Sequence, residues 1–159
     1  MNLLAQRVLS SSLYIEKKKI VSIERGILAL VGFEKGDNSS DCEIIADKLL
    51  NYRIFSDDKG RMENSVIDIK GDLLLVPEVT LALETRKGTR PSFSEAANPE
   101  LGKRLFDELS NKLREIHDRL EVGIFGADME INLINDGPVP SYLKVLILSN
   151  LTRFFFFGF

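Results

Sequence analysis

The chain holds a single histidine and a single cysteine, which limits the side chains that could act as a base or nucleophile. A catalytic triad would have to use His117, which lies between Ile116 and Asp118 near the end of an amphipathic segment. A solvated or helix-terminal role is typical at such a position. Cys42 opens a predicted helix, but acidic residues flank it on both sides and oppose formation of a thiolate. We therefore expect neither side chain to be catalytic.

Metal and nucleotide chemistry find little support in the sequence. No cysteine or histidine cluster has zinc-ligand spacing, and no glycine-rich phosphate loop is present. Asp57 and Asp58 stand in an Asp-Asp-Lys-Gly sequence, which a turn explains. We expect no metal site and no cofactor.

The apolar segment from Leu74 to Ala82 contains Pro77, which is unusual for a buried strand. Because proline lacks a backbone donor, it predicts a bend or bulge there. Thr80 and the backbone N–H groups after Pro77 would then point out of the sheet. A strand edge with an exposed threonine explains the same residues, and both interpretations stay open.

A second unusual segment, residues 135–141, reads Asn-Asp-Gly-Pro-Val-Pro-Ser. Its two prolines and one glycine predict a rigid turn that presents backbone carbonyls in fixed directions and could include a cis X–Pro bond. A hairpin turn between two strands is the interpretation that the residues alone favour.

The elements that must position these segments are mostly strands. Apolar stretches predict strands at 3–8, 13–15, 20–23, 27–33, 73–76, 122–125, 129–134 and 142–148. Helices are predicted after Asn38 and after Asn98-Pro99, the second with an apolar stripe from Leu101 to Leu120. The pattern indicates one α+β domain, with a curled, mainly antiparallel, barrel-like sheet and two main helices.

Composition and charge exclude several classes of protein. The 159 residues are 44% hydrophobic and carry 21 basic against 24 acidic side chains, a net charge of −3, as in ordinary globular domains. One cysteine favours a reducing compartment, and the first residues lack the pattern of a signal peptide.

The C-terminus is strongly apolar, with five of the ten phenylalanines in the last six residues. The stretch from Tyr142 onward spans only 18 residues and includes Lys144 and Arg153, whereas a membrane-spanning helix needs about 20 mostly apolar residues. We expect a terminal strand and a tail, residues 147–159, rather than a membrane anchor.

Taken in order, several stretches resemble the D-aminoacyl-tRNA deacylase family across residues 1–146, which we take as one domain. The matching segments are Gln6-Arg7-Val8, Gly32-Phe33-Glu34-Lys35-Gly36-Asp37, Tyr52-Arg53-Ile54-Phe55-Ser56-Asp57, Thr80-Leu81-Ala82, Gly88-Thr89-Arg90-Pro91-Ser92-Phe93, Phe125-Gly126-Ala127-Asp128-Met129 and Asn135-Asp136-Gly137-Pro138-Val139. The resemblance implies a cytoplasmic homodimer that hydrolyses the ester of D-aminoacyl-tRNA, or of glycyl-tRNA(Ala).

The resemblance also implies the site. Gly137, Pro138 and Val139 would reach the partner subunit's site, where backbone carbonyls bind the substrate's amino group and exclude an L side chain. The catalytic residues would be Thr80, Val79 and Glu78, within a segment that is Ser-Gln-Phe-Thr in the family and Pro-Glu-Val-Thr here. Backbone N–H groups would stabilise the oxyanion, and the 2′-hydroxyl of the terminal adenosine would assist water.

A basic loop beside Thr80 would bind the tRNA phosphates. Residues 85–94 hold Arg86, Lys87 and Arg90 without an acid, a local +3, whereas residues 105–136 hold eight acids and three bases, a local −5. A net negative charge therefore does not exclude RNA as a partner. Because so few phosphates are contacted, binding should be modest and sensitive to salt.

Two other functions remain open. A homologue could bind tRNA ends or D-amino acids with slow hydrolysis, because Pro77 and Glu78 replace the family's serine and glutamine. The second open function is that of a general esterase that depends on threonine or on His117.

Overall fold

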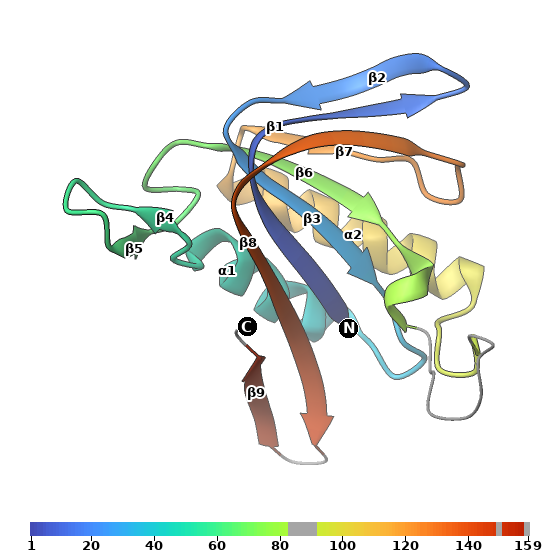
Figure 1. The fold of residues 1–159 in the computed structure, drawn as a ribbon. Helices are drawn as coiled ribbons and strands as arrows, with labels where there is room; N and C mark the ends of the chain where they lie inside the picture. Colours follow the sequence, from blue (N-terminus) through green and yellow to red (C-terminus); the bar gives the residue numbers. More distant parts are fainter. Residues whose placement is uncertain (83–91, 149–150, 158–159) are drawn as a thin grey trace.

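The structure, a computed structural model, describes residues 1–82, 92–148 and 151–157 (Figure 1). Along the chain the elements are β1 (Asn2–Ile15), β2 (Lys18–Ile23), β3 (Gly26–Gly32), α1 (Ser39–Asn51), β4 (Phe55–Ser56), β5 (Met62–Asn64), β6 (Asp72–Pro77), the 3₁₀ helix η1 (Val79–Ala82), α2 (Pro99–Ile116), β7 (Leu120–Val122), β8 (Glu130–Leu148) and β9 (Leu151–Phe157). Neither α1 nor α2, the long helices of the described chain, has the length and hydropathy needed to cross a membrane.

Seven strands of the described chain form one sheet in the order β7-β6-β3-β1-β8-β9, with β2 also paired to β1. Four of its six pairings are antiparallel, and β3-β6 and β6-β7 are parallel. The long strand β1 pairs with β3 through residues 2–8 and with β2 through residues 11–15, which curls the sheet. The predicted α+β domain with a curled, mainly antiparallel sheet and two main helices is therefore confirmed.

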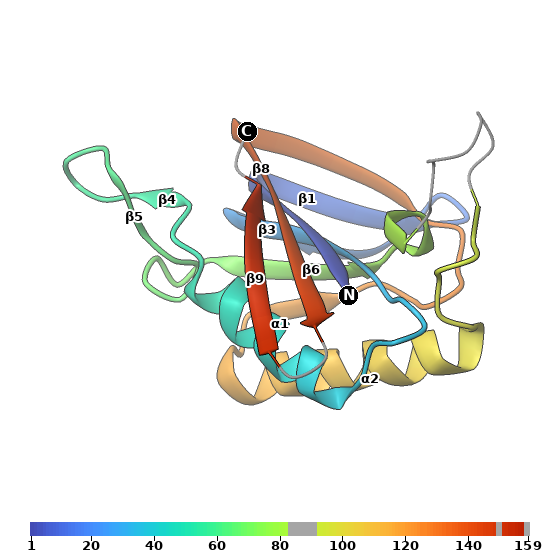
Figure 2. The same cartoon turned by 90° about the horizontal axis from the view of Figure 1, so that it is seen from below.

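Both long helices cover the same face of the sheet (Figure 2). Asn38 caps α1 through a capping box, and Asn98 caps α2 with Pro99 at its first position, as the sequence predicts. Leu105, Leu109 and Leu113 of α2 are fully buried in the main core. The helices thus form one wall of a continuous apolar interior.

Alternate residues of β6 serve two cores. Leu73 and Leu75 point to the helices, whereas Leu74 and Val76 belong to a second apolar cluster on the opposite face. There the curled sheet packs against itself, since Leu13 of β1 and Ile23 of β2 join this cluster. Burial on both faces explains why β6 reads as an uninterrupted apolar run.

Several predicted boundaries differ from the structure, beginning with the predicted strands 3–8 and 13–15, which are one strand, β1. Helix α2 ends at Ile116, which is 61% exposed, and His117 caps it, so that Leu120 begins β7 instead of continuing the helix. The predicted strand at 122–125 lies earlier, at Leu120–Val122. The predicted hairpin turn at 135–141 is wrong, because β8 runs through it from Glu130 to Leu148.

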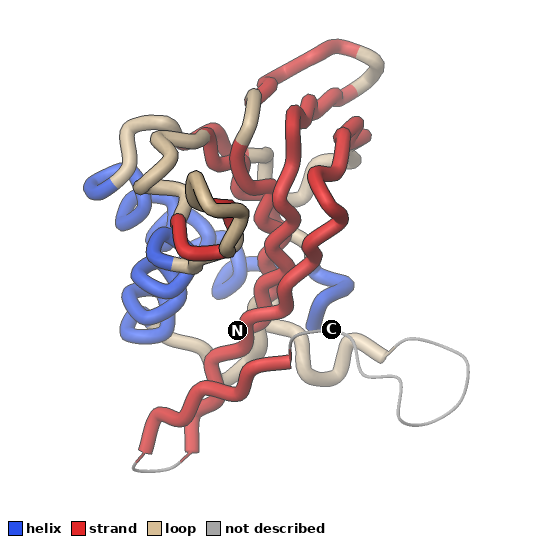
Figure 3. Tube along the Cα trace, turned by 60° about the vertical axis from the view of Figure 1, so that its left-hand side comes forward, coloured by secondary structure: helices blue, strands red, loops and turns tan. Residues whose placement is uncertain are grey.

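The predicted turn at Asp57–Gly60 joins β4 and β5, which form a separate small hairpin (Figure 3). At the C-terminus, β9 pairs antiparallel with β8 from Tyr142 to Leu148. Most of the segment that we expected to be a tail therefore forms a further strand of the sheet.

The pairing of β3 with β6 starts at Gly26, which leads to a stability prediction. A Cβ at Gly26 would lie 1.8 Å from the carbonyl oxygen of Asp72, far inside contact distance. We expect Gly26→Ala to lower the free energy of unfolding by about 3 kcal/mol in urea titrations, because the strands must separate. Gly36→Ala is the matched control, since its Cβ would meet nothing within 4 Å. Equal stabilities of the two variants would contradict the prediction.

Candidate active site

Pro77 ends strand β6 instead of bending it. It pairs with Val31 as the last residue in register, and the next N–H, of Glu78, donates to the Val31 carbonyl at 2.7 Å. Beyond that bond the chain turns into η1, beginning at Val79. The bend or bulge predicted from this proline is therefore a strand end, followed by a helical turn exposed to solvent.

Glu78 holds the start of η1 with its side chain. Its Oε1 accepts a hydrogen bond from the Thr80 N–H at 3.1 Å and another from the Thr80 hydroxyl at 2.6 Å. Thr80 is exposed, as one of the sequence interpretations required, but both of its donors face this carboxylate. The Val79 N–H has no hydrogen-bond partner among the described residues. Of the two backbone donors expected for an oxyanion, only that of Val79 is thus available in this arrangement.

A cleft of about 500 Å³ opens beside this turn. It lies between the carboxyl ends of β3 and β6, the start of α2 and the loop at 125–129, and its lining is mainly apolar. Lining residues are Val31, Gly32, Phe33, Val76, Pro77, Glu78, Val79, Ala97, Pro99, Gly102, Phe125, Gly126, Ala127, Asp128, Met129 and Ile131. Glu78 and Val79 thus face the cleft, whereas Thr80 is not among the lining residues.

The loop at 125–129 supplies a wall of the cleft that we had not assigned to the site. Phe125 packs on Phe106 of α2 with ring centroids 6.2 Å apart, and Gly102 leaves room for it, since a Cβ there would lie 3.0 Å from the Phe125 ring. In the sequence, this wall is marked only by the short run Gly126-Ala127-Asp128 after an apolar strand, and these residue types do not by themselves indicate a site. Its place in the cleft depends on the packing of α2.

Gly137 and Pro138 lie in a bulge of β8. Val8 of β1 pairs with Asn135, and Gln6 pairs with Pro140, so that residues 136–139 stand opposite Arg7 alone. The Gly137–Pro138 peptide bond is cis, and Gly137 has φ +127°. A Cβ at Gly137 would lie 2.7 Å from Val139 Cγ2, which explains the glycine.

Arg7 anchors this bulge. Its Nε lies 3.1 Å from both the Asp136 carbonyl oxygen and Asp136 Oδ2, and its Nη1 donates to the Ile54 carbonyl at 2.6 Å. The Arg7 side chain is only 12% exposed, whereas Gly137 and Pro138 are exposed. The bulge therefore presents its backbone outward on a fixed base. None of residues 137–139 lines the described cleft, so a single chain does not bring the two segments together.

The basic residues expected to bind tRNA, Arg86, Lys87 and Arg90, lie outside the described residues. The segment that contains them leaves the described chain after η1 and returns before α2. Both of these elements border the cleft.

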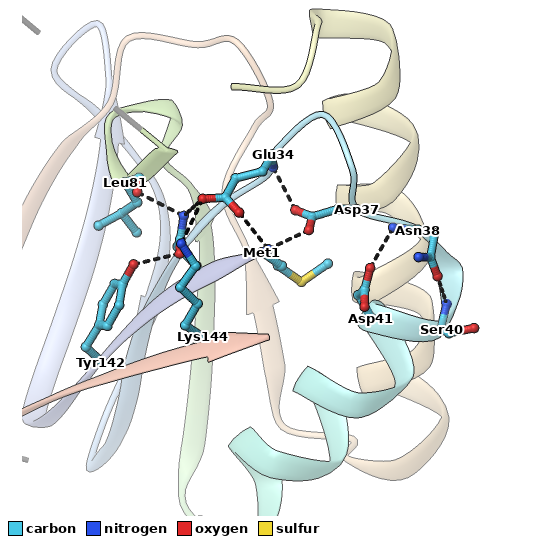
Figure 4. Close-up of polar contacts among 10 residues, drawn as sticks. Met1, Glu34, Asp37, Asn38, Ser40, Asp41, Leu81, Tyr142 and Lys144 are labelled. Carbon is cyan, nitrogen blue, oxygen red and sulfur yellow. Dashed lines mark hydrogen bonds and ion pairs between the residues drawn. The ribbon is translucent and has the colours of Figure 1, made fainter. Parts of the chain in front are cut away.

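A polar network holds the far end of η1 (Figure 4). Asn2 donates from Nδ2 to the Leu81 carbonyl at 3.1 Å and to Glu34 Oε1 at 2.9 Å, and its Oδ1 accepts from the Tyr142 hydroxyl at 2.6 Å. Lys144 Nζ completes the network at 3.1 Å from Glu34 Oε1. Strands β1 and β8 thereby fix the turn that carries Glu78 and Val79.

Burial and charge act in opposite directions on the acidic groups of this network. Burial raises the pKa of Glu34, but the Asn2 hydrogen bond, the Met1 ammonium and Lys144 outweigh it, so that this pKa lies below its ordinary value of 4.5. Burial raises the pKa of Asp37, and the Met1 ammonium, 2.5 Å from Asp37 Oδ1, offsets only part of that effect.

The lone histidine and cysteine are structural. His117 is 6% exposed, and its Nε2 lies 2.9 Å from the Gly71 carbonyl oxygen, so the helix-terminal role is confirmed and a solvated one is wrong. Cys42 is fully buried, and burial raises the pKa of its thiol to about 12. Neither residue lines the cleft. A His117-dependent esterase therefore finds no geometric support.

These features define a class: an α+β domain whose curled mixed sheet carries a cleft where two parallel strands end. A sequence model described as D-Tyr-tRNA(Tyr) deacylase matches residues 4–144. The chain belongs to this family, which confirms the resemblance seen in the sequence and, with it, the assignment to the hydrolases.

Individual relatives support the same assignment. A D-aminoacyl-tRNA deacylase of Francisella tularensis subsp. tularensis is 46% identical over 140 residues, covering 88% of this chain and 97% of that protein. One from Teredinibacter turnerae is 50% identical over 144 residues, covering 91% and 99%.

Solved structures share the fold. The structure titled c-Myc DNA Unwinding Element Binding Protein is 31% identical with a TM-score of 0.89, covering 92% of this chain and 100% of that chain. A probable eukaryotic D-amino acid tRNA deacylase, 17% identical with a TM-score of 0.78, covers 86% and 95% and supports the fold alone.

The depressed pKa of Glu34 gives a prediction for the dependence of stability on pH. A group with a lower pKa in the folded state stabilises the protein above its unfolded pKa, and this contribution is lost as pH falls through the folded value. We expect Glu34→Gln to lose about 1 kcal/mol at pH 7, because the carboxylate is part-exposed and solvent screens its ion pairs. The deficit should shrink in urea titrations repeated below pH 4.5.

Glu63→Gln is the matched control, since Glu63 pairs with Arg53 on the exposed surface. A deficit of Glu34→Gln that stays constant across this pH range would show that the Glu34 charge does not contribute.

Proposed function

We propose that this protein hydrolyses the ester between a D-amino acid and the terminal adenosine of tRNA, and that it also accepts glycyl-tRNA(Ala). The observation that carries the proposal is the cleft, which is lined by Val79 with its backbone N–H unpaired among the described residues, in a chain that belongs to the deacylase family. The relatives' names state deacylation of D-aminoacyl-tRNA. A cytoplasmic homodimer is the form in which we expect it to act.

In this mechanism the enzyme supplies position and electrostatics. The ester carbonyl oxygen would face the Val79 N–H, which stabilises the negative charge that develops when water attacks. The water oxygen bonds to the carbonyl carbon, the bond to the ribose oxygen breaks, and the proton of the water passes to that oxygen. The adenosine 2′-hydroxyl can relay this proton, so that no protein base is needed.

Glu78 and Thr80 would determine where the Glu78 charge lies relative to the Val79 N–H. The Thr80 hydroxyl holds the Glu78 carboxylate at the start of η1, which keeps that charge on the turn instead of at the reacting ester. Thr80 would therefore act on Glu78, and Val79 on the substrate.

Chiral selection would come from Gly137, Pro138 and Val139 of the partner subunit. In support, the first two are exposed and Arg7 fixes the bulge from beneath. Backbone carbonyls that bind the amino group would leave no room for an L side chain, whereas any D side chain would point away. Glycine has no side chain to exclude and would pass.

The first prediction of this proposal concerns stereochemistry. We expect D-Tyr-tRNA to be hydrolysed at least about 100-fold faster than L-Tyr-tRNA, with glycyl-tRNA(Ala) close to the D ester, because a site that clashes with one isomer rejects it strongly. Rates of deacylation on the three esters provide the measurement. Similar rates on the D and L esters would refute the chiral filter.

Gly137→Ala tests the location of the filter. Its Cβ would lie 2.7 Å from Val139 Cγ2 and 3.2 Å from Arg7 Nη2, so the bulge must shift. The ratio of D to L rates should fall about tenfold or more. Gly36→Ala, in open space, should leave the ratio unchanged.

The alternative is a binding protein with slow hydrolysis, and Glu78 is the observation that favours it. A carboxylate that occupies the Thr80 donors competes with the oxyanion for them. Restoring the family residues with Pro77→Ser and Glu78→Gln separates the two functions. Under our proposal kcat/KM on D-Tyr-tRNA changes less than about threefold, because the Val79 N–H stays in place. A large gain would favour the alternative.

Arg86, Lys87 and Arg90, which lie between η1 and α2 along the chain, are proposed to contact the tRNA phosphates. Since three cations meet few phosphates, affinity for tRNA should be modest and should fall with salt.

A further inference from the structure

A second depression, which we call the groove, adjoins the cleft. It has a volume of about 560 Å³ and shares Val79, Ala97 and Pro99 with the cleft. Its lining residues are Lys35, Val79, Phe93, Ala96, Ala97, Asn98, Pro99 and Leu101. A molecule bound in the cleft could therefore continue into the groove without leaving the protein surface.

Phe93 stands at this groove and is 57% exposed. Phe93 is the aromatic residue among the large hydrophobic side chains that are exposed in the described part of the chain. Val79, which also lines the groove, is 52% exposed. Exposed aromatic rings of this kind serve as stacking platforms for unpaired bases.

The backbone around Phe93 is fixed although its ring is exposed. The Ala96 N–H donates to the Phe93 carbonyl at 3.1 Å, and the Ala97 N–H donates to Phe33 at 2.9 Å. Glu34 and Ala96 form an isolated bridge between the two segments. The ring therefore projects from a positioned segment, and this lowers the entropy lost when a ligand stacks on it.

Lys35 supplies a cation at the groove. It is exposed, and it has no ion pair with the described residues. Glu34, which precedes Lys35, pairs with Lys144 and the Met1 ammonium. Glu95 and Glu100 of the facing segment are exposed, and none of these three acids lines the groove. An aromatic platform next to one lysine fits one nucleotide, its base on Phe93 and its phosphate at Lys35.

We propose that the groove binds the nucleotide that precedes the terminal adenosine of the substrate. This inference rests on the proposed function, which places the ester and its adenosine in the cleft. The RNA chain must leave the adenosine on its 5′ side, and the groove shares a wall with the cleft. Phe93 stacks the penultimate base, and Lys35 neutralises the phosphate between the two nucleosides.

The test compares two probes that do not react, cytidylyl-adenosine and adenosine 5′-monophosphate, by equilibrium binding to the full-length protein. We expect Phe93→Ala to weaken binding of the dinucleotide about tenfold, as loss of one base stack predicts, and to leave the mononucleotide unchanged. Lys35→Ala should reduce the dependence of dinucleotide binding on salt. Met62→Ala, at a side chain that is 55% exposed on β5, is the matched control.

Three results would overturn the groove assignment. These are equal losses for both probes with Phe93→Ala, no binding of the dinucleotide above that of the mononucleotide, and a change in oligomeric mass that would make Phe93 a contact between copies. Failure of the proposed function would look different, since D-Tyr-tRNA would then not be hydrolysed while the Phe93-dependent preference for the dinucleotide persisted.

Discussion

The parallel pairing of β3 with β6 is the constraint on which the other features of the molecule depend. It starts where Gly26 meets Asp72 and ends where Val31 meets Pro77, so it fixes both ends of β6 at once. Its side chains alternate between two cores, which ties the helices on one face to the curled part of the sheet on the other. Since Pro77 can donate no further ladder bond, the chain must leave the sheet there, and the cleft opens at that point.

The chemistry that we propose for this site depends on backbone groups more than on side chains. A backbone N–H cannot be lost by substitution unless proline replaces it, and the Val79 N–H remains although neighbouring residues differ from the family's segment. The network of Asn2, Glu34, Tyr142 and Lys144 then matters because it holds the Leu81 carbonyl, and with it the whole turn. A precise position costs conformational entropy, and here the hydrogen bonds of two distant strands offset that cost.

Sequence patterns predicted the elements well where local signals were strong. The caps at Asn38 and Asn98, the buried runs of β3 and β6 and the turn after Asp57 are each specified by neighbouring residues. The continuous course of β8 was missed because pairing with β1, distant in sequence, overrides the turn signals of two prolines and a glycine. Phe125 as a wall of the cleft depends on tertiary packing, for which short-range spacing carries no signal, whereas Glu78 holds η1 through a local contact with Thr80, two residues on.

The pairing of β9 has a consequence for how two copies of the chain could meet. From Tyr142 to Leu148, β8 has β9 along the edge that β1 leaves open. An unpaired edge there would be a template for strand addition, and β9 fills it from within the same chain. While this hairpin persists, two subunits cannot merge their sheets through that part of β8 into one continuous sheet. The outer edge of the sheet on that side belongs to β9, so any strand pairing between copies there would have to run through β9 instead of β8.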